Sequence, residues 1–164
     1  GCMINREGDN VGKILFMNCS PNKNGNTFQI GEKILKGKEH EILQMVDYWI
    51  SQYGQVYPDD QISEVLSKIS TFDVLVIGSP VYWYTVGGLL KTFIDRLYML
   101  DEAEALRGKK LYFFAQGSSP DEKTIESITF LANRLSYLMG MDLKSVVIDS
   151  SFGEKILNQM SMEF

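Results

Sequence analysis

The sequence predicts an α/β domain built on a doubly wound, five-stranded parallel sheet with helices on both faces. Three observations lead to this fold class. The chain has 164 residues, which is about the length of one domain and enough to bury a core. Short continuous apolar runs alternate with segments of helical spacing, and no internal repeat is visible. Parallel strands need helical crossovers, whose handedness places helices on both faces of the sheet.

The first expected strand covers residues 13–18, because a short apolar run suits a central parallel strand buried on both faces. A turn-rich stretch at 20–26 follows it. The next helix is expected to begin near Asn26 or Thr27 and to end at Gly37.

Residues 41–46 form the second expected strand, and an irregular, aromatic-rich segment at 47–58 follows it. Asp59 or Asp60 is then expected to cap a helix. The apolar residues of that helix share one face: Ile62, Val65, Leu66 and Ile69.

Residues 73–78 form the third expected strand, and a loop at 79–88 leads into a helix. That helix should turn its apolar residues inward: Leu89, Leu90, Phe93, Ile94, Leu97 and Leu100. Residues 110–115 form the fourth strand, and residues 143–149 form the fifth, before a short terminal helix. Between them, a long helix closed by Gly140 has apolar residues at helical spacing: Ile125, Ile128, Leu131, Leu135 and Leu138.

Composition narrows the function classes. A net charge of -5 and a pI near 4.9 argue against nucleic-acid binding, and no apolar run approaches the roughly 18 residues of a membrane span. With cysteines only at positions 2 and 19 and a single histidine, we expect neither a disulfide framework nor a metal site, and we expect a reducing, cytoplasmic location. Cys19 is expected to be a small core residue. We expect a single domain over residues 1–164, with a loose segment at 1–11.

Ligands of such sheets bind outside the carboxyl ends of the strands, at the topological switch point, which selects the loops at 20–27, 79–88 and 116–120. The first loop has hydroxyl and amide side chains and a glycine at the start of a helix, a pattern that suits a phosphate: Ser20, Asn22, Asn24, Asn26 and Thr27. It lacks the spacing of an ATP-binding P-loop. An ordinary turn with a helix cap is the alternative that this loop alone leaves open.

The second loop places Tyr82, Trp83 and Tyr84 directly after a buried strand. Adjacent rings at such a position suit a flat heterocycle or a subunit interface, and packing on the protein's own surface is the alternative. The third loop offers small polar groups and backbone amides, which suit a ring edge or a plain turn.

Three motifs now point to a known family: SPNKNGNT at 20–27, SPVYWY at 79–84 and LKTFIDR at 90–96. In these motifs and their spacing the chain resembles the NAD(P)H-dependent FMN reductases of the flavodoxin-like superfamily, including their iron–sulfur flavoprotein branch. The resemblance implies a flavodoxin-like sheet with strand order 2-1-3-4-5, FMN as the cofactor and NAD(P)H as the co-substrate. It further implies hydride transfer through FMN to a quinone, a flavin or another small acceptor.

The resemblance also implies a set of site residues. The FMN phosphate would be held by Ser20, Asn22, Asn26 and Thr27. The flavin ring would be lined by Pro80, Val81, Tyr82 and Trp83, with Gly117 and Ser118 near its far edge. No catalytic residue is named, because the flavin carries the redox chemistry.

The chain departs from the family pattern at two places. Asn22 stands where family members often have a basic residue, so dipoles and Lys23 would have to balance the phosphate charge. The segment 47–58 contains no cysteine, so the cysteine cluster of the iron–sulfur branch is not expected.

The family commonly forms dimers or tetramers, and we expect a homodimer or homotetramer here. Seven aromatic residues lie in segments that should reach the same edge of the sheet: Tyr48, Trp49, Tyr53, Tyr57, Tyr82, Trp83 and Tyr84. One domain cannot bury them all, so a partner chain is the simplest cover. Two other functions remain open at this point, a non-enzymatic flavodoxin-like electron carrier and an interaction domain without a cofactor.

Overall fold

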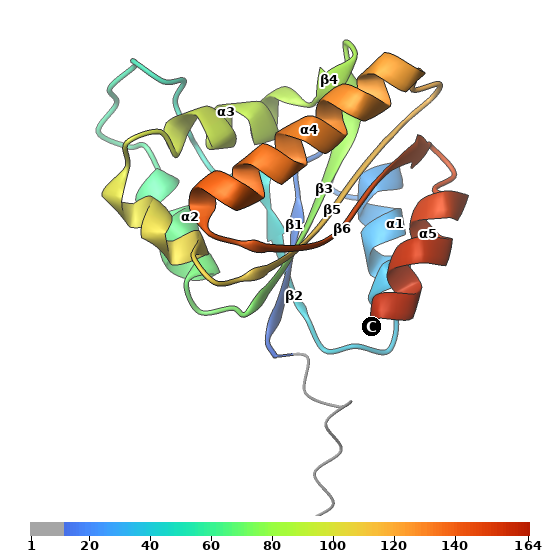
Figure 1. Cartoon of the computed structure of the whole chain (residues 1–164). Helices are drawn as coiled ribbons and strands as arrows, with labels where there is room; N and C mark the ends of the chain where they lie inside the picture. The colour runs from blue at the N-terminus through green and yellow to red at the C-terminus, as the bar shows by residue number, and fades with distance from the viewer. Residues whose placement is uncertain (1–11) are drawn as a thin grey trace, which may run out of the picture.

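A parallel sheet between two layers of helices forms the centre of the computed structural model, which describes residues 12–164 (Figure 1). The expected loose segment at residues 1–11 lies outside the described residues. The strands run in the order β2-β1-β3-β5-β6. Their bounds are Ile14–Asn18 (β1), Glu41–Gln44 (β2), Val74–Tyr82 (β3), Lys110–Gly117 (β5) and Asp142–Ser150 (β6). This is the predicted fold class and order, with β5 and β6 as the predicted fourth and fifth strands.

Helices cover both faces of the sheet, as the sequence predicts (Figure 1). One face carries α1 (Asn26–Ile34) and α5 (Glu154–Met160). The other face carries α2 (Ile62–Ile69), α3 (Gly88–Arg96) and α4 (Glu122–Met139). Within residues 12–164, no helix combines the length and the apolar character needed to cross a membrane.

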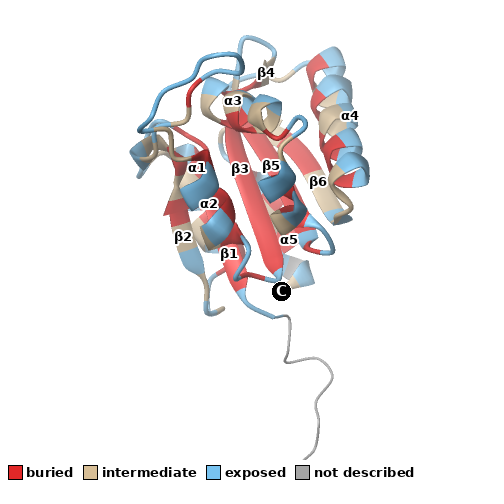
Figure 2. Ribbon diagram, turned by 90° about the vertical axis from the view of Figure 1, so that its left-hand side faces the viewer, coloured by how far each residue is buried: buried red, intermediate tan, exposed pale blue. Residues whose placement is uncertain are grey.

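The central strands are buried on both faces, which their continuous apolar sequences predict (Figure 2). Alternate residues of β1 point to opposite faces, so that Phe16 packs on the α1 side while Leu15 and Met17 pack on the α2 side. Close packing of the sheet requires a glycine at position 31, because a Cβ there would overlap the ring of Phe16. The helices therefore lie tightly on the sheet and fix where its loops emerge.

Two details differ from the sequence prediction. The third strand continues past Gly78 to Tyr82, so the first half of the expected loop at 79–88 is strand, with Pro80 in register with Gln116. The chain then turns back into the short strand β4, Thr85–Val86, which pairs antiparallel with the end of β3. Leu138, expected to face inward, is 59% exposed near the end of α4. Cys19 is fully buried as predicted, and burial raises the pKa of its thiol to about 12.

Candidate functional site

Three strand ends meet at one edge of the sheet, because β1, β3 and β5 are neighbours in the strand order. The N–H of Cys19 donates to the carbonyl of Gly78 at 2.9 Å, which holds the chain after β1 against β3. The loops after β1 and β5 and the hairpin after β3 therefore emerge side by side, at the top of Figure 1. This is the edge at which the sequence analysis expected a ligand.

The loop after β1 is held by its own polar groups. The N–H of Ser20 donates to Oδ1 of Asn18 at 3.2 Å, and Oγ of Ser20 accepts from the N–H of Asn22 at 3.0 Å. The side chain of Ser20 is buried, whereas Asn22, Asn24 and Asn26 are exposed. The loop thus presents three amide side chains to solvent from a fixed turn.

The start of α1 offers free donors to an anion. Gly25 is its N-cap residue, and a glycine has no side chain to accept from the first N–H groups of the helix. In α4, by contrast, Oδ1 of Asp121 accepts from the N–H of Thr124 at 2.8 Å. No acidic residue lies in the first turn of α1. The helix dipole and these N–H groups therefore favour a phosphate at α1.

Thr27 connects this loop to β5. Its side chain is fully buried, and its Oγ1 accepts a hydrogen bond from Nε2 of Gln116 at 2.9 Å. The hydroxyl proton of Thr27 stays available for a further acceptor. Gln116, which the sequence analysis did not name as a site residue, directly precedes Gly117. Its position at the carboxyl end of β5 was the signal that could have identified it.

Lys23 is paired on the side of the loop that faces β2. Its Nζ lies 2.5 Å from Oδ1 of Asp47, and both side chains are about half exposed. An exposed ion pair of this kind contributes little and exchanges readily with other partners. Gln44 adds a bond from its Nε2 to the carbonyl of Lys23 at 3.3 Å.

The hairpin after β3 has a strained aromatic tip. Trp83 and Tyr84 have φ values of 48° and 66°, in the left-handed region that usually selects asparagine and glycine in two-residue hairpins. Their side chains are 91% and 72% exposed. Neither the backbone preference nor burial explains aromatic residues here, which points to a contact outside this chain's own core.

A cavity of about 270 Å³ lies between this tip and the loop after β5. It brings together four of the predicted flavin-ring residues: Val81, Trp83, Gly117 and Ser118. Three further lining residues, Tyr84, Ser119 and Pro120, belong to the two loops that the sequence analysis selected, whereas Thr124 was not predicted. The helix-cap spacing from Asp121 to Thr124 was the signal that could have placed Thr124 at this edge.

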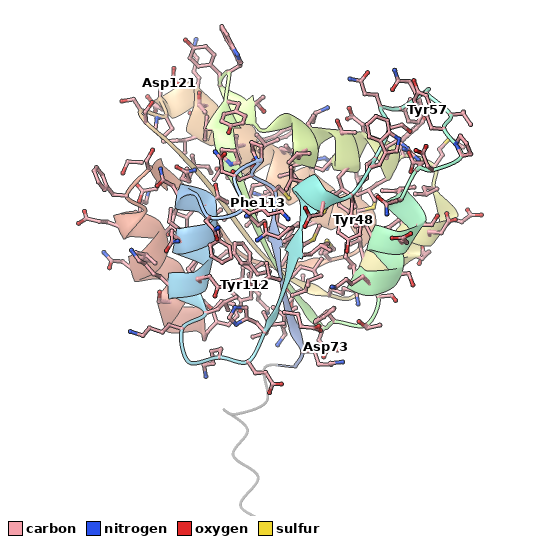
Figure 3. All side chains as sticks on the ribbon, turned by 180° about the vertical axis from the view of Figure 1, so that it is seen from behind. Tyr48, Tyr57, Asp73, Tyr112, Phe113 and Asp121 are labelled. Atoms are coloured by element: carbon pink, nitrogen blue, oxygen red, sulfur yellow. The ribbon has the colours of Figure 1, made fainter. Side chains whose placement is uncertain are left out.

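Pro80 and Tyr82 do not line this cavity with the other predicted residues. Side chains alternate along a strand, and both residues approach Gly87 on the other side of the hairpin from Val81. A larger cavity of about 480 Å³, bordered by Asp73 and Lys110, lies at the opposite edge of the sheet. Figure 3 shows Asp73 at that edge, far from Asp121. The ligand site of such a sheet is expected at the carboxyl edge, so we assign the smaller cavity, between the hairpin and the loop after β5, as the candidate site.

The comparison with protein families identifies the family of this chain. Residues 12–151 match the family model described as NADPH-dependent FMN reductase. The chain belongs to this family. The predicted family, whose model describes NADPH-dependent FMN reductases, is thereby confirmed.

Two relatives illustrate how similar this FMN reductase family member is to known proteins. It is 37% identical to an iron-sulfur flavoprotein of Archaeoglobus fulgidus over 53% of its own length and 49% of that relative's. It is 26% identical to the NAD(P)H-dependent FMN-containing oxidoreductase YwqN of Bacillus subtilis, over 83% of each chain. The match thus spans about half the length of the archaeal relative.

Solved structures confirm the fold. The Trp repressor binding protein from Bacillus subtilis superposes with a TM-score of 0.72 at 24% identity, over 92% of this chain and 99% of that chain. An FMN-dependent NADH-azoreductase from Bacillus anthracis, solved in complex with FMN, superposes with a TM-score of 0.66 at 14% identity, over 92% and 95%. At these identities the likeness establishes the flavodoxin-like fold.

Proposed function

We propose that this chain transfers hydride from NAD(P)H, through bound FMN, to a small acceptor such as a quinone or a free flavin. Residues 1–164 would act as one FMN-binding domain. The observation that carries the proposal is the meeting of an uncapped helix start and an aromatic, glycine-lined cavity at the carboxyl edge of the sheet. We place the protein in the cytoplasm, where buried free thiols such as Cys19 stay reduced.

The phosphate of FMN would lie at the start of α1. Its donors would be the N–H groups of the first turn, the amides of Asn22, Asn24 and Asn26, and the hydroxyls of Ser20 and Thr27. The dipole of α1 supplies part of the positive potential that a basic residue at position 22 would otherwise provide. Lys23 supplies the rest when phosphate displaces Asp47 from it.

The isoalloxazine ring would lie against the β3–β4 hairpin and the loop after β5. Val81 and Trp83 offer apolar and aromatic contact from one side, and Gly117 and Ser118 leave room and backbone groups on the other. Tyr82 and Pro80 would support the hairpin from the side opposite Val81, where both lie near Gly87. When bound, the flavin supplies the two-electron chemistry. The protein's residues bind it, orient it and exclude water, and we assign no protein acid or base.

Titration with FMN and a turnover assay test this proposal. The purified protein should bind one FMN per chain and oxidise NADPH or NADH in the presence of menadione or free FMN. Binding without pyridine-nucleotide oxidation would favour an electron carrier instead. Failure to bind FMN would favour an interaction domain without a cofactor.

A homodimer or homotetramer is part of the proposal. Six of the seven aromatic residues predicted at an interface are exposed: Trp49, Tyr53, Tyr57, Tyr82, Trp83 and Tyr84. Tyr48 instead packs against the core. The exposed rings form two surfaces rather than one, since Tyr57 lies at the opposite end of the edge from Asp121 (Figure 3). Exposed aromatic surfaces of this kind favour a partner chain.

Light scattering of the FMN-loaded protein at micromolar concentration tests the oligomer. We expect a mass of at least twice the 18.6 kDa of one chain. A mass near 18.6 kDa with FMN bound would contradict it.

A further inference from the structure

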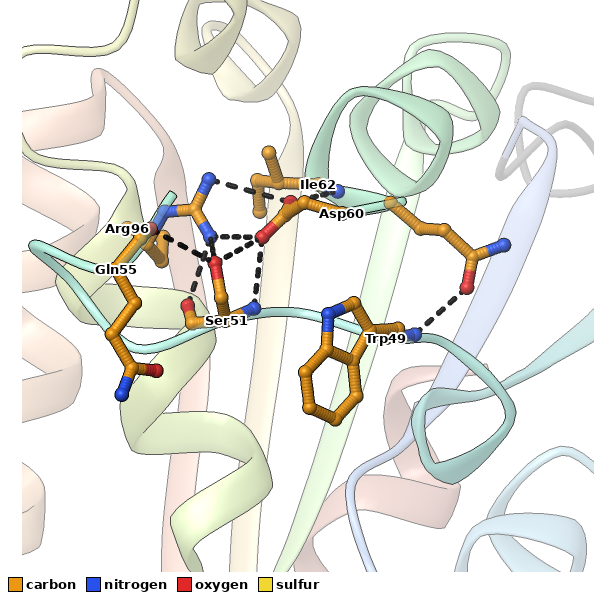
Figure 4. A network of polar contacts seen from close by, with 7 residues as sticks. Trp49, Ser51, Gln55, Asp60, Ile62 and Arg96 are labelled. Carbon is orange, nitrogen blue, oxygen red and sulfur yellow. Dashed lines mark hydrogen bonds and ion pairs between the residues drawn. The ribbon is translucent and has the colours of Figure 1, made fainter. Parts of the chain in front are cut away.

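A partly buried charged cluster outside the candidate site joins the loop of residues 48–61 to the end of α3 (Figure 4). Nη1 of Arg96 donates to Oδ2 of Asp60 at 2.5 Å, to the carbonyl of Ser51 at 2.8 Å and to Oγ of Ser51 at 3.0 Å. Its Nη2 donates to Oδ1 of Asp60 at 3.3 Å. The N–H and the hydroxyl of Ser51 also donate to Asp60. We call these three residues the Ser51–Asp60–Arg96 cluster.

The cluster is too well buried and too well connected to be an ordinary surface pair. The side chains of Arg96 and Asp60 are only 18% and 11% exposed. Burial alone would raise the pKa of Asp60, but the hydrogen bonds from Arg96 and Ser51 outweigh it and hold the pKa well below its ordinary value. Both charges are therefore kept, and removal of either one would leave the other partly buried without its opposite charge.

The loop that this cluster holds makes few other contacts with the rest of the chain, apart from Tyr48 and Ile50 against the core and the ring of Tyr53 against that of Tyr98. It contains no helix or strand, and every residue from 52 to 59 is exposed. The N–H of Gln61 donates to the carbonyl of Trp49 at 2.7 Å, which closes the base of the loop. Segments with few buried contacts open locally at low cost in free energy, so loss of the cluster should favour opening of this loop.

The loop begins beside the phosphate loop. Asn18 donates from its Nδ2 to Oε1 of Gln44 at 2.8 Å, and Lys23 pairs with Asp47, the residue before Tyr48. Tyr48 and Ile50 then line a cavity of about 150 Å³ with the first turn of α3, which follows the aromatic hairpin directly. The first part of the loop therefore lies between the phosphate loop and the first turn of α3, on the β2 side of the carboxyl edge.

We propose that Arg96 and Asp60 are positioning residues, which hold the 48–61 loop in one conformation so that it forms the β2-side wall of the acceptor site. The assignment of the loop as a wall of the acceptor site rests on the proposed function. The loop would contact the acceptor through Tyr48 and Ile50, and the cluster itself would touch neither FMN nor acceptor. Its removal should therefore change the KM for the acceptor rather than the affinity for FMN.

The variants Arg96→Met and Asp60→Asn test this, with Lys91→Met as the matched control. Lys91 lies on the same helix and forms an exposed pair with Asp95 at 2.6 Å. Chymotrypsin cleavage at Tyr53 and Tyr57, compared at a concentration where light scattering gives the same mass for each variant, reports opening of the loop. We expect Arg96→Met to raise the cleavage rate by at least about tenfold, because cleavage follows the population of the open loop. In a Trp83→Phe background, the emission of Trp49 reports the same opening without protease.

Turnover with menadione tests whether the 48–61 loop forms a wall of the acceptor site. Arg96→Met should raise the KM for menadione by about fivefold, leave kcat within about twofold and leave the Kd for FMN within about twofold. Arg96→Lys keeps the charge without the planar fork and should lie between Arg96→Met and the unchanged protein in both assays. It also serves as the test variant if Arg96→Met fails to fold.

Each possible outcome decides part of the inference. Equal cleavage rates for Arg96→Met and Lys91→Met would show that the cluster does not hold the loop. Faster cleavage with an unchanged KM for menadione, or a KM change that follows loss of FMN, would show that the loop is not a wall of the acceptor site. Failure of the unmodified protein to reduce either menadione or free FMN would overturn the proposed function and the wall, while the cleavage comparison would still decide the role of the cluster.

Discussion

Replacing Thr27 with valine tests the link between the phosphate loop and β5. Valine has nearly the shape of threonine, so the change removes the hydroxyl without opening a cavity. The side chains of Thr27 and Gln116 are 0% and 6% exposed, so Nε2 of Gln116 loses its 2.9 Å acceptor in a place that water reaches poorly. An unpaired buried amide costs about 1–3 kcal/mol. We therefore expect Tm to fall by about 2–12 °C in a chain of this length.

The same variant should weaken FMN binding, because Thr27 also loses its donor to the phosphate. A hydrogen bond to a charged group accounts for about 1–2 kcal/mol, which is roughly a 5- to 30-fold increase in Kd. Thr27→Ser keeps the hydroxyl and serves as the control.

The double variant Thr27→Val/Gln116→Leu separates the two roles of the hydroxyl. Replacing both hydrogen-bond partners with apolar groups of similar size is nearly neutral, so most of the lost Tm should return. The FMN affinity should stay low. Recovery of FMN affinity in the double variant would refute a direct contact of Thr27 with the phosphate. An unchanged Tm in Thr27→Val would refute the structural role of the Gln116 bond.

Three further changes probe other parts of the molecule. Trp83→Ala should weaken FMN by about 0.5–1.5 kcal/mol and alter the flavin absorbance, and an unchanged titration would remove Trp83 from the site. Trp83→Asn with Tyr84→Gly should instead stabilise the fold by about 1–2 kcal/mol while weakening FMN, because the new residues suit positive φ, and urea unfolding measures the gain. His40→Gln should cost more stability at pH 5.5 than at pH 8.5. Burial alone would lower the pKa of His40, but the Lys38 carbonyl and Glu32 raise it above its ordinary value, so the stabilisation is present at low pH and is lost as pH rises through the raised pKa. Equal costs at both pH values would contradict that role.

Local patterns in the sequence were enough to predict the layers of the fold. The residues expected on the buried face of α2 are all buried, and Gly140 ends α4 in the left-handed conformation. The extension of β3 was missed because Pro80 normally argues against a central strand and because the hairpin tip lacks the usual asparagine and glycine. Leu138 fits helical spacing, but at this end of α4 it is Met139 that packs against the core, and Leu138 remains exposed.

The candidate site was predictable where it depends on strand order and less so where it depends on distant contacts. The rule for parallel sheets selected the loops at this edge, and the family resemblance named Val81, Trp83, Gly117 and Ser118, which line one cavity. The bond between Thr27 and Gln116 joins residues 89 positions apart, and that between Asp60 and Arg96 joins residues 36 apart. Asp60 was predicted only as a helix cap, since no spacing rule connects it to Arg96.

Anaerobic mixing of the FMN-loaded protein with NADPH or NADH tests the central claim most directly. We predict that the visible absorbance band of the bound flavin bleaches faster than that of free FMN under the same conditions. Addition of menadione should then restore the band. A protein that binds FMN but leaves the band unchanged with both pyridine nucleotides, or that binds no FMN at all, would contradict the account.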